Sequence, residues 1–253
     1  MIGELLPRAA LTAAEIADMY RLFSTHFERV SAARFGCDLE RKDWVIRVRE
    51  REVLLGFSSL QLLRVRHGGR DLDVLYSGDT IMRPEARSTT LLARTWIDGV
   101  RRISERYALA ELHWLLLVSG FRTYRLLPVF WREFFPCHLR CAPADVRRTV
   151  DELAASLFGA GYDACAGIVR FDAPQPLRPE LSRIPASRLA DPHVSFFASA
   201  NPGHAEGDEL VCWTRLAHDN LTAAGARMWQ ACERTPARAY PLSSVRPGGA
   251  GRA

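Results

Sequence analysis

The sequence lacks three features that would point to common functional classes. It has no run of about 18 apolar residues, so no membrane-spanning helix is expected. Its net charge is +5, yet it has no block of about five or six basic residues, so no nucleic-acid partner is expected. The N-terminus has no basic segment before an apolar core, which predicts no secretory signal and a cytoplasmic protein.

Lysine and paired cysteine motifs are scarce as well. Lys42 is the only lysine among 34 basic residues, and the arginines are spread along the chain. Cys137 and Cys141 are the only closely spaced cysteines, and a zinc site would need two more ligands at a suitable spacing. We therefore expect no metal. The modest positive charge suits an anionic partner.

Hydrophobic periodicity predicts an α/β protein whose first part alternates helices with antiparallel strands. A helix is expected to begin after Thr12, because Glu15 follows three residues later and completes a capping box. The expected helices of this part cover 13–27, 91–107 and 123–134, and the expected strands cover 43–48, 53–63, 72–77 and 113–118.

The pattern changes after Pro136, where proline-rich sequence separates the remaining elements. A helix is expected over 144–158 and another over 219–231, with strands over 167–171, 193–198 and 209–216 and an extended connector over 173–192. We predict four parts: a core (1–140), a helix and proline-rich insertion (141–192), a strand pair and helix that close the sheet (193–234), and a disordered tail (235–253).

The most informative segment is V-L-Y-S-G-D-T-I-M-R-P-E-A-R-S-T-T-L-L, residues 74–92. It predicts a buried strand, a turn at Pro84 and a loop of small hydroxylated residues that opens a helix. The N-terminus of a helix binds anions through its dipole and its free N–H groups, so this segment predicts a phosphate site. A second apolar strand follows and leads through Ser119 and Gly120 into an aromatic helix.

This order resembles the core of the GNAT superfamily of N-acyltransferases, whose motif is roughly V-x-P-x-x-R-x-x-G-x-G/A. Met82, Pro84 and Arg87 fall in register with its first part. The glycines are replaced by Ser88, Thr89 and Thr90, whose Cβ atoms limit close approach of a pyrophosphate. The resemblance covers about residues 40–140 and 193–232. It implies a mixed, largely antiparallel sheet flanked by helices, with a C-terminal extension.

The same resemblance implies an N-acyltransferase that moves an acyl group from a thioester to an amine. The donor is expected to be acyl-CoA or an acyl-phosphopantetheine on a carrier protein, and no permanently bound cofactor is expected. Three segments, S-G-D-T-I, G-F-R-T-Y-R-L-L-P and N-P-G-H-x-x-G-D-E-L, also look like a bacterial group near enzymes that place fatty acyl chains on peptide lysine or ornithine. The alternatives are a non-catalytic module that binds acyl thioesters or acyl carriers, and an arginine-rich scaffold.

Residue roles follow from this resemblance. The expected donor-binding residues are Met82, Arg87, Ser88, Thr89 and Thr90. Asp79 is the candidate base, with an Asx turn cap as the alternative. Ser77 and Thr80 are candidate catalytic residues, and orienting Asp79 or satisfying backbone groups is the alternative for both. Tyr124 is the candidate acid for the leaving thiolate, with a structural hydrogen bond as the alternative.

A second group of residues is expected to bind the substrates. Arg122 is a candidate for binding a phosphate or a carrier carboxylate. The turn-rich loop from Asn201 to Asp208 and the adjacent Glu209 are candidates for binding an acceptor ammonium, and a tight hairpin is the alternative. An aromatic cluster is expected to be core or to line an acyl groove: Phe121, Phe130, Trp131, Phe134 and Phe135. His26 is expected to be exposed.

Overall fold

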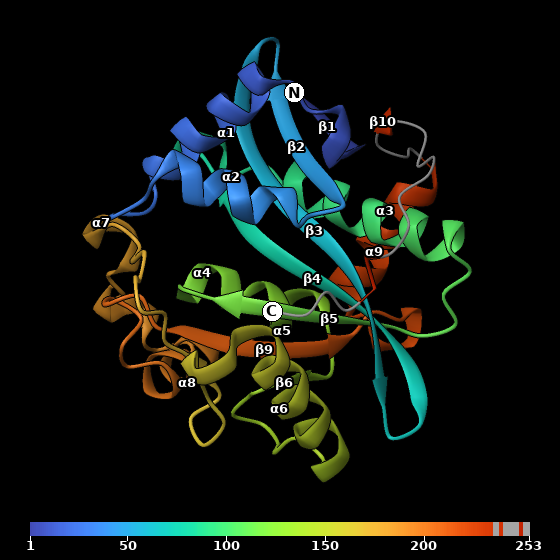
Figure 1. Ribbon diagram of the computed structural model, residues 1–253, viewed down its shortest axis with the longest axis vertical. Helices are drawn as coiled ribbons and strands as arrows, with labels where there is room; N and C mark the ends of the chain where they lie inside the picture. The colour runs from blue at the N-terminus through green and yellow to red at the C-terminus, as the bar shows by residue number, and fades with distance from the viewer. Residues whose placement is uncertain (235–237, 240–247, 250–253) are drawn as a thin grey trace.

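The computed structural model describes residues 1–234, 238–239 and 248–249, and its centre is a single mixed sheet (Figure 1). The strand order is β10-β1-β2-β3-β4-β5-β9-β8-β7, with β11 beside β3 and β6 beside β9. The strands are β1 (Ile2–Pro7), β2 (Trp44–Glu50), β3 (Val53–His67), β4 (Arg70–Met82), β5 (Leu112–Val118), β6 (Phe134–Phe135), β7 (Tyr162–Asp163), β8 (Ile168–Val169), β9 (Glu209–Arg215), β10 (Arg238–Ala239) and β11 (Gly248–Gly249).

Most neighbouring strands are antiparallel, as the sequence predicts. Strands β1 to β4 form an antiparallel meander, and β9 pairs antiparallel with β5. In the described part of the chain, β4 and β5 are the one parallel pair in which both strands exceed two residues. The parallel pairing requires a crossover, which α3 (Leu91–Arg106) provides. The predicted class, a mixed and largely antiparallel sheet flanked by helices, is confirmed.

Helices cover both faces of the sheet. On the face named here the α2 face, α1 (Ala13–Ser24) and α2 (Ala32–Glu40) pack against β2 and β3, and α6 (Ala144–Phe158) packs against β4, β5 and β9. The opposite α3 face carries α3, α4 (Phe121–Tyr124), α5 (Leu126–Phe130), α8 (Pro192–Ala200) and α9 (Ala223–Arg234). No helix among the described residues is both long and apolar enough to cross a bilayer.

Alternating side chains along β4 divide the core between these two faces. Leu75 joins the cluster under α3, whereas Val74 and Tyr76 join the cluster under α6. This alternation follows from the two-residue period of a strand, and it lets one strand support both layers of helices. Short helices connect the elements: α7 (Pro179–Ser182) and the 3-10 helices Arg8–Ala10, Pro84–Ala86, Gly159–Gly161, Ala186–Arg188 and His218–Asn220.

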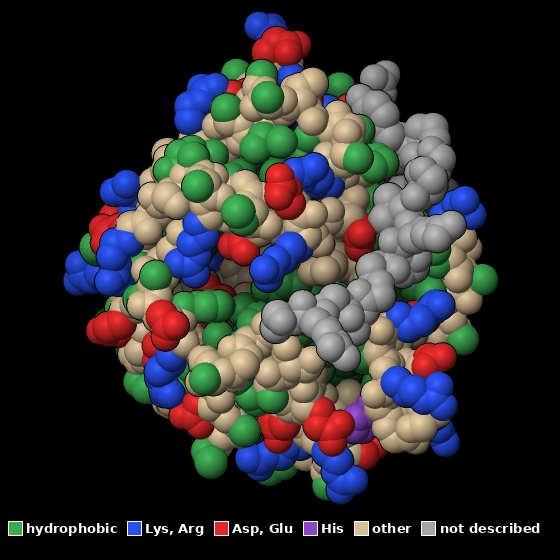
Figure 2. All heavy atoms as spheres, viewed as in Figure 1, with side chains coloured by type: hydrophobic (Ala, Val, Ile, Leu, Met, Phe, Trp, Pro, Cys, Tyr) green, Lys and Arg blue, Asp and Glu red, His purple; other side chains and the backbone are tan. Residues whose placement is uncertain are grey.

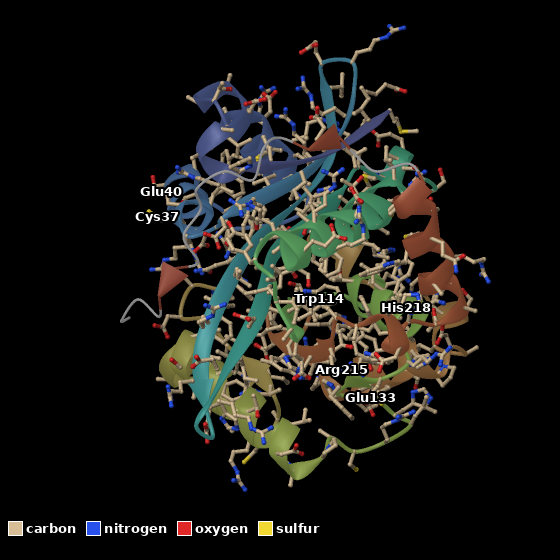
Figure 3. The ribbon with its side chains drawn as sticks, turned by 90° about the vertical axis from the view of Figure 1, so that its right-hand side faces the viewer. Cys37, Glu40, Trp114, Glu133, Arg215 and His218 are labelled. Carbon is tan, nitrogen blue, oxygen red and sulfur yellow. The ribbon has the colours of Figure 1, made fainter. Side chains whose placement is uncertain are left out.

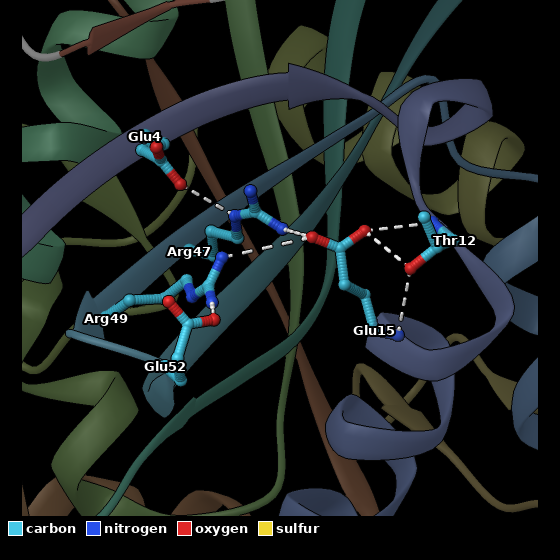
Figure 4. Close-up of polar contacts among 6 residues, drawn as sticks. All are labelled: Glu4, Thr12, Glu15, Arg47, Arg49 and Glu52. Atoms are coloured by element: carbon cyan, nitrogen blue, oxygen red, sulfur yellow. Dashed lines mark hydrogen bonds and ion pairs between the residues drawn. The ribbon is translucent and has the colours of Figure 1, made fainter.

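A buried ion-pair network fixes α1 on the sheet (Figure 4). Arg47 of β2 donates to Glu4 of β1 over 2.7 Å and also to Glu15 of α1, and its side chain is almost fully buried. Glu15 and Thr12 form the predicted capping box. Burial alone would raise the pKa of Glu15, but the Thr12 backbone N–H and the Arg47 guanidinium hold this pKa below its usual value. The network therefore sets the position of α1 and of the residues that follow it.

Several predicted elements are wrong or shifted. The segment 193–198 is helix α8 rather than a strand, because Pro192 opens it and the Asp191 side chain accepts from the N–H of His193. The predicted helix 123–134 is two short helices, since Pro128 lacks an N–H and the chain is extended from Trp131 onward. The helix predicted over 13–27 ends at Ser24.

Other boundaries moved or were not predicted. Strand β1 and helix α2 were absent from the prediction, the last helix runs over 223–234 instead of 219–231, and the strand predicted over 167–171 is limited to Ile168–Val169. The connector over 173–192 contains α7 and a 3-10 helix rather than being extended throughout. The disordered tail predicted over 235–253 lies outside the described residues, apart from the four residues of β10 and β11.

Candidate functional site

Strands β4 and β5 separate in the middle of the sheet. Their pairing runs from Asp73 beside Leu112 to Ser77 beside Leu116, although β4 continues for five more residues. A bulge begins where the pairing stops: against β3, Ser77 faces Leu60 while Thr80 faces Ser58. Two residues of β4, Gly78 and Asp79, therefore stand opposite one residue of β3, and a bulge bends its strand locally. The place where β4 and β5 diverge, from Gly78 onward, is called the gap here.

On the α3 face, a cavity of about 360 Å³ lies beside this gap. Its wall is mainly apolar, and Trp96 and Trp114 lie against each other there with ring centroids 4.3 Å apart. Figure 3 shows Trp114 inside the molecule, far from Cys37 and Glu40 on the outer side of α2. The other apolar wall residues are Ile81, Met82, Leu92, Ala93, Ile97, Leu126, Phe130, Trp131, Leu177 and Leu181.

The polar groups of the cavity gather at the N-terminus of α3. Thr89, Leu92 and Ala93 line the cavity, so the first turn of α3 faces it, where helix N–H groups lack intrahelical acceptors. Arg87 and Arg122 line it as well. Burial, together with the positive charges of Arg87 and Arg188, lowers the pKa of Arg122. Cationic side chains crowded beside a helix N-terminus favour an anionic group at this place.

His26 also lines the cavity, which corrects the expectation that it is exposed. It follows α1, and its Nε2 lies 3.1 Å from the carbonyl oxygen of Met82 while its Nδ1 lies 3.1 Å from that of Leu22. Burial lowers its pKa, and Arg87 lies beside it. No local sequence pattern indicates this placement of His26, because it depends on a contact between residues 56 positions apart.

The connector 173–192 closes the cavity on the side of α1. Phe27 and Leu177 form a bridge, and the backbone N–H of Arg178 donates to the carbonyl of His26 over 2.8 Å. These contacts hold Leu177 and Leu181 against the cavity. Both residues were missed, since a proline-rich segment without periodicity resembles an ordinary surface connector.

The predicted donor-binding residues divide into two groups. Met82, Arg87 and Thr89 line the cavity, whereas Ser88 and Thr90 are exposed and are not among its lining residues. Thr89 uses its hydroxyl to accept from the N–H of Leu91 over 3.1 Å, which caps the start of α3. Three of the five predicted donor-binding residues therefore line the same cavity.

Ser77 and Thr80 lie at the gap but have hydrogen-bond partners. Ser77 is buried and accepts from the indole Nε1 of Trp114 over 2.8 Å, which orients one wall of the cavity. The hydroxyls of Thr80 and Ser58 are 2.8 Å apart, and Thr80 also lines the cavity. Neither hydroxyl has a base as its partner, so this geometry favours the structural alternative for both.

A polar cluster lies on the α2 face of the same gap; it consists of Lys42, Tyr76, Asp79, Ser119 and Glu209. Burial raises the pKa of Asp79 to about 6, although the ammonium of Lys42 acts in the opposite direction. Burial likewise raises the pKa of Glu209 to about 7, while a hydrogen bond from Ser119 over 2.9 Å opposes the rise. Near neutral pH both carboxyls are therefore close to their titration points.

The five members of this polar cluster come from distant parts of the chain. Tyr76 and Asp79 belong to β4, Glu209 begins β9, and Lys42 precedes β2. Its Nζ lies 4.4 Å from the centroid of the Tyr76 ring, a cation–π distance. Figure 2 shows acidic and basic side chains close together in the middle of this face of the molecule. Sequence reasoning selected Asp79 and Glu209 but missed Lys42 and Tyr76.

The remaining predicted residues are held in structural contacts. The hydroxyl of Tyr124 donates to the carbonyl of Pro136 over 2.8 Å, its ring is fully buried, and it does not line the cavity. Asn201 is also fully buried, and its Nδ2 donates to the carbonyl of Asp208 over 2.9 Å. The Asp208 carboxylate pairs with Arg170 over 3.1 Å. The geometry favours structural roles for these three residues.

The expected aromatic cluster divides in the same way. Phe130 and Trp131 line the cavity, whereas Phe121, Phe134 and Phe135 are buried core residues that do not. The break between α5 and β6 causes this division, because it turns the chain away from the cavity after Trp131.

Comparisons with known proteins give structural matches. No family model matches the sequence, and no curated protein matches it. Among solved structures, the chain is similar to a probable N-acyltransferase from Enterococcus faecalis, with a TM-score of 0.40 and 15% identity over 50% of this chain and 32% of the other. It is also similar to a GCN5-related N-acetyltransferase from Kribbella flavida (0.38, 12% identity, 87% and 67% covered).

A third match is a GNAT family acetyltransferase from Brucella melitensis in complex with acetyl-CoA. Its TM-score is 0.34, with 13% identity over 48% of this chain and 80% of the other. This chain spans about a third of the length of the Enterococcus protein. All three structures carry the name of an acyl- or acetyltransferase.

Proposed function

We propose that this protein is a GNAT-type N-acyltransferase that moves a fatty acyl group from an acyl thioester to an amine. One observation carries the proposal: β4 and β5 diverge at a place that has an apolar cavity on one face of the sheet and a pair of carboxyls on the other. Such an arrangement suits acyl transfer, because the amine must reach the carbonyl carbon of the bound thioester, so the donor and acceptor sites must meet at one point.

The donor is assigned to the α3 face. The thioester's phosphate meets the first turn of α3 and the side chains of Arg87 and Arg122, and the acyl chain fills the apolar cavity, packed against the wall that Trp96 and Trp114 form. An acetyl group would leave most of 360 Å³ empty, whereas each buried methylene contributes about 0.8 kcal/mol. The apolar wall therefore favours a longer chain.

The acceptor amine is assigned to the α2 face. Asp79 takes the proton that the amine loses, and Glu209 attracts the ammonium form as it enters. A carboxyl with a pKa of about 6 is ionised at neutral pH and is more basic than an ordinary aspartate, which suits this task. The peptide side chain of lysine or ornithine is an acceptor of the right chemistry, because it presents a primary amine on a flexible chain.

The direct test combines decanoyl-CoA with a peptide that carries one ornithine and follows both free CoA and peptide mass. We expect one CoA released for each acylated peptide, and a higher kcat/KM for decanoyl-CoA than for acetyl-CoA. Tight binding of decanoyl-CoA without any amide product would instead support the alternative, a non-catalytic acyl-thioester or acyl-carrier binding module.

The donor's carrier is a separate question. Ser88, Thr89 and Thr90 replace the glycines that would let a pyrophosphate approach, and a carrier protein's arm presents a single phosphodiester. We therefore propose acyl carrier protein as the better donor. Matched decanoyl thioesters of CoA and of a carrier protein should differ in kcat/KM in favour of the carrier, and a clear preference for CoA would contradict this choice.

A further inference from the structure

Lys42 stands out because its amine lies at the bulge of β4. A Cβ built on Gly78 would lie 2.9 Å from Cε and 3.4 Å from Nζ of Lys42, so the amine lies over the bulge at Gly78. Its one aromatic contact, with Tyr76, holds it 4.4 Å from the ring centroid. Within the described residues, Nζ makes no hydrogen bond and no ion pair within 4.0 Å.

The amine is placed where an acceptor would be. The β4–β5 pairing stops at Ser77. On the proposed function, the thioester reaches from the cavity of the α3 face into the place where the strands diverge, and its carbonyl carbon then lies beside Gly78. Burial lowers the pKa of Lys42 and thus increases its neutral, nucleophilic fraction, while Asp79 opposes that shift. Asp79 follows Gly78 in the chain and is the nearest candidate for accepting a proton.

We infer that Lys42 is a self-acylation site that takes the acyl group from the protein's own bound thioester. This inference rests on the proposed function. Nζ attacks the thioester carbonyl carbon, an amide bond forms, and the C–S bond breaks. The proton lost by the amine passes to the Asp79 carboxylate and from there to the departing thiolate. The products are Nε-acyl-Lys42 and a free thiol, so no further reactant is required.

Self-acylation would change the site itself. The amide is neutral, so Asp79 loses the nearby positive charge that opposes the rise of its pKa. The attached chain also occupies the place of the acceptor beside the bulge. An acylated protein should therefore acylate added amines more slowly than an unmodified one, so acylation of Lys42 would lower the turnover rate.

The test exploits the fact that Lys42 is the only lysine of the chain. The purified protein is incubated with decanoyl-CoA at pH 7.5 in the absence of any amine, and its intact mass and its peptides are measured. We expect a gain of one decanoyl group, located on Lys42, and no such gain in Lys42→Arg. Asp79→Asn should slow the modification by about 100-fold, within the range for loss of a general base.

A matched control separates catalysed from spontaneous acylation. Arg66→Lys adds a second lysine at a position whose side chain is 75% exposed, remote from the gap. Self-acylation predicts modification of Lys42 and not of the added lysine. Equal labelling of both lysines, or labelling of the Met1 amine alone, would overturn the inference.

The two proposals fail separately. An unmodified Lys42 in a protein that acylates an added ornithine peptide would overturn self-acylation and leave the proposed function standing. An unmodified Lys42 together with no acylated peptide would overturn self-acylation and count against the proposed function as well.

Discussion

The two faces of the β4–β5 gap differ in chemistry although they share the same strands. The α3 face offers an apolar cavity whose wall comes from four helices, two strands and the connector, with arginines only at its entrance. The α2 face offers two half-buried carboxyls and one lysine amine. The α3 face therefore suits the removal of a hydrocarbon chain from water, whereas the α2 face suits proton transfer.

The two faces also differ in how they affect the stability of the folded protein. Burying Trp96 and Trp114 stabilises the protein, because apolar area leaves water. Burying Asp79 and Glu209 disfavours their charged forms, as their raised pKa values record. Groups that disfavour the folded state at neutral pH are expected at sites of function more than in an ordinary core.

The largest effect is expected from Asp79→Asn, which removes the base from the α2 face. It should lower kcat by about 10²–10⁴-fold, the usual contribution of general acid–base catalysis. The binding of decanoyl-CoA on the α3 face should stay unchanged in a titration. Asp71→Asn, on the same strand but with an exposed side chain, serves as the control. A folded Asp79→Asn protein with wild-type kcat would remove this residue from the mechanism.

Filling the cavity on the α3 face should change the preference for acyl-chain length and leave the transfer step itself unaffected. Ala93 lines the cavity, and Ala93→Leu would take up space for the acyl chain. Losing the burial of about two methylenes costs about 1.6 kcal/mol, so kcat/KM for decanoyl-CoA should fall by about tenfold while that for acetyl-CoA changes little. The exposed Ala110→Leu is the control. An equal fall for both donors would mean that the acyl chain does not lie here.

A smaller effect is expected at the entrance of the cavity. Arg122→Gln removes one positive charge near the first turn of α3, so KM for the CoA thioester should rise a few-fold with kcat nearly constant. The rise should shrink at high salt, because salt screens the lost attraction. Arg66→Gln changes the same charge at an exposed site and should leave KM as it is. A fall in kcat alone would place Arg122 in the chemical step instead.

The cost of burying a carboxyl on the α2 face can be tested at Glu209 by measuring how the stability of the protein depends on pH. Its pKa in the folded protein lies above the ordinary 4.5, so its stabilising contribution is present below that value and is lost as pH rises through about 7. Glu209→Gln should therefore raise the unfolding midpoint at pH 8 and leave it nearly unchanged at pH 4. Urea unfolding at the two pH values measures this difference, and a variant destabilised at pH 8 would show that the charge is well accommodated.

The smallest effect is expected from Tyr124→Phe. The sequence made Tyr124 the candidate acid, but its hydroxyl donates to Pro136 away from the cavity. Loss of this hydrogen bond should cost about 1 kcal/mol of stability and leave kcat nearly unchanged. A kcat loss that shrinks when an aryl thioester replaces the alkyl thioester would restore Tyr124 as the proton donor for the thiolate.

The parts of the site that lie close together in sequence could be predicted. Strand β4, its loop and helix α3 are one continuous segment with clear periodicity, so Asp79, Arg87 and Thr89 were found. The bulge was read as the end of a strand, because Ser77, Gly78 and Asp79 are typical turn residues.

The rest depends on contacts that no local pattern records. His26 and Leu177 reach the cavity through pairings between α1, β4 and the connector. Trp96 and Trp114 have the spacing of ordinary core residues, so the cavity that they line could not be predicted from the sequence. The strand predicted over 193–198 failed for a related reason: its apolar run fits either element, and the cap at Asp191 decides for the helix.

The central claim is that the donor binds on the α3 face and the acceptor on the α2 face. A crystal structure with a non-hydrolysable decanoyl-CoA analogue tests it most directly. We predict the acyl chain in the cavity of the α3 face, against Trp96 and Trp114, with the carbonyl at Gly78 in the gap and facing Asp79 and Lys42. An acyl chain among the charged groups of the α2 face, or one that lies outside the cavity on the surface, would contradict it.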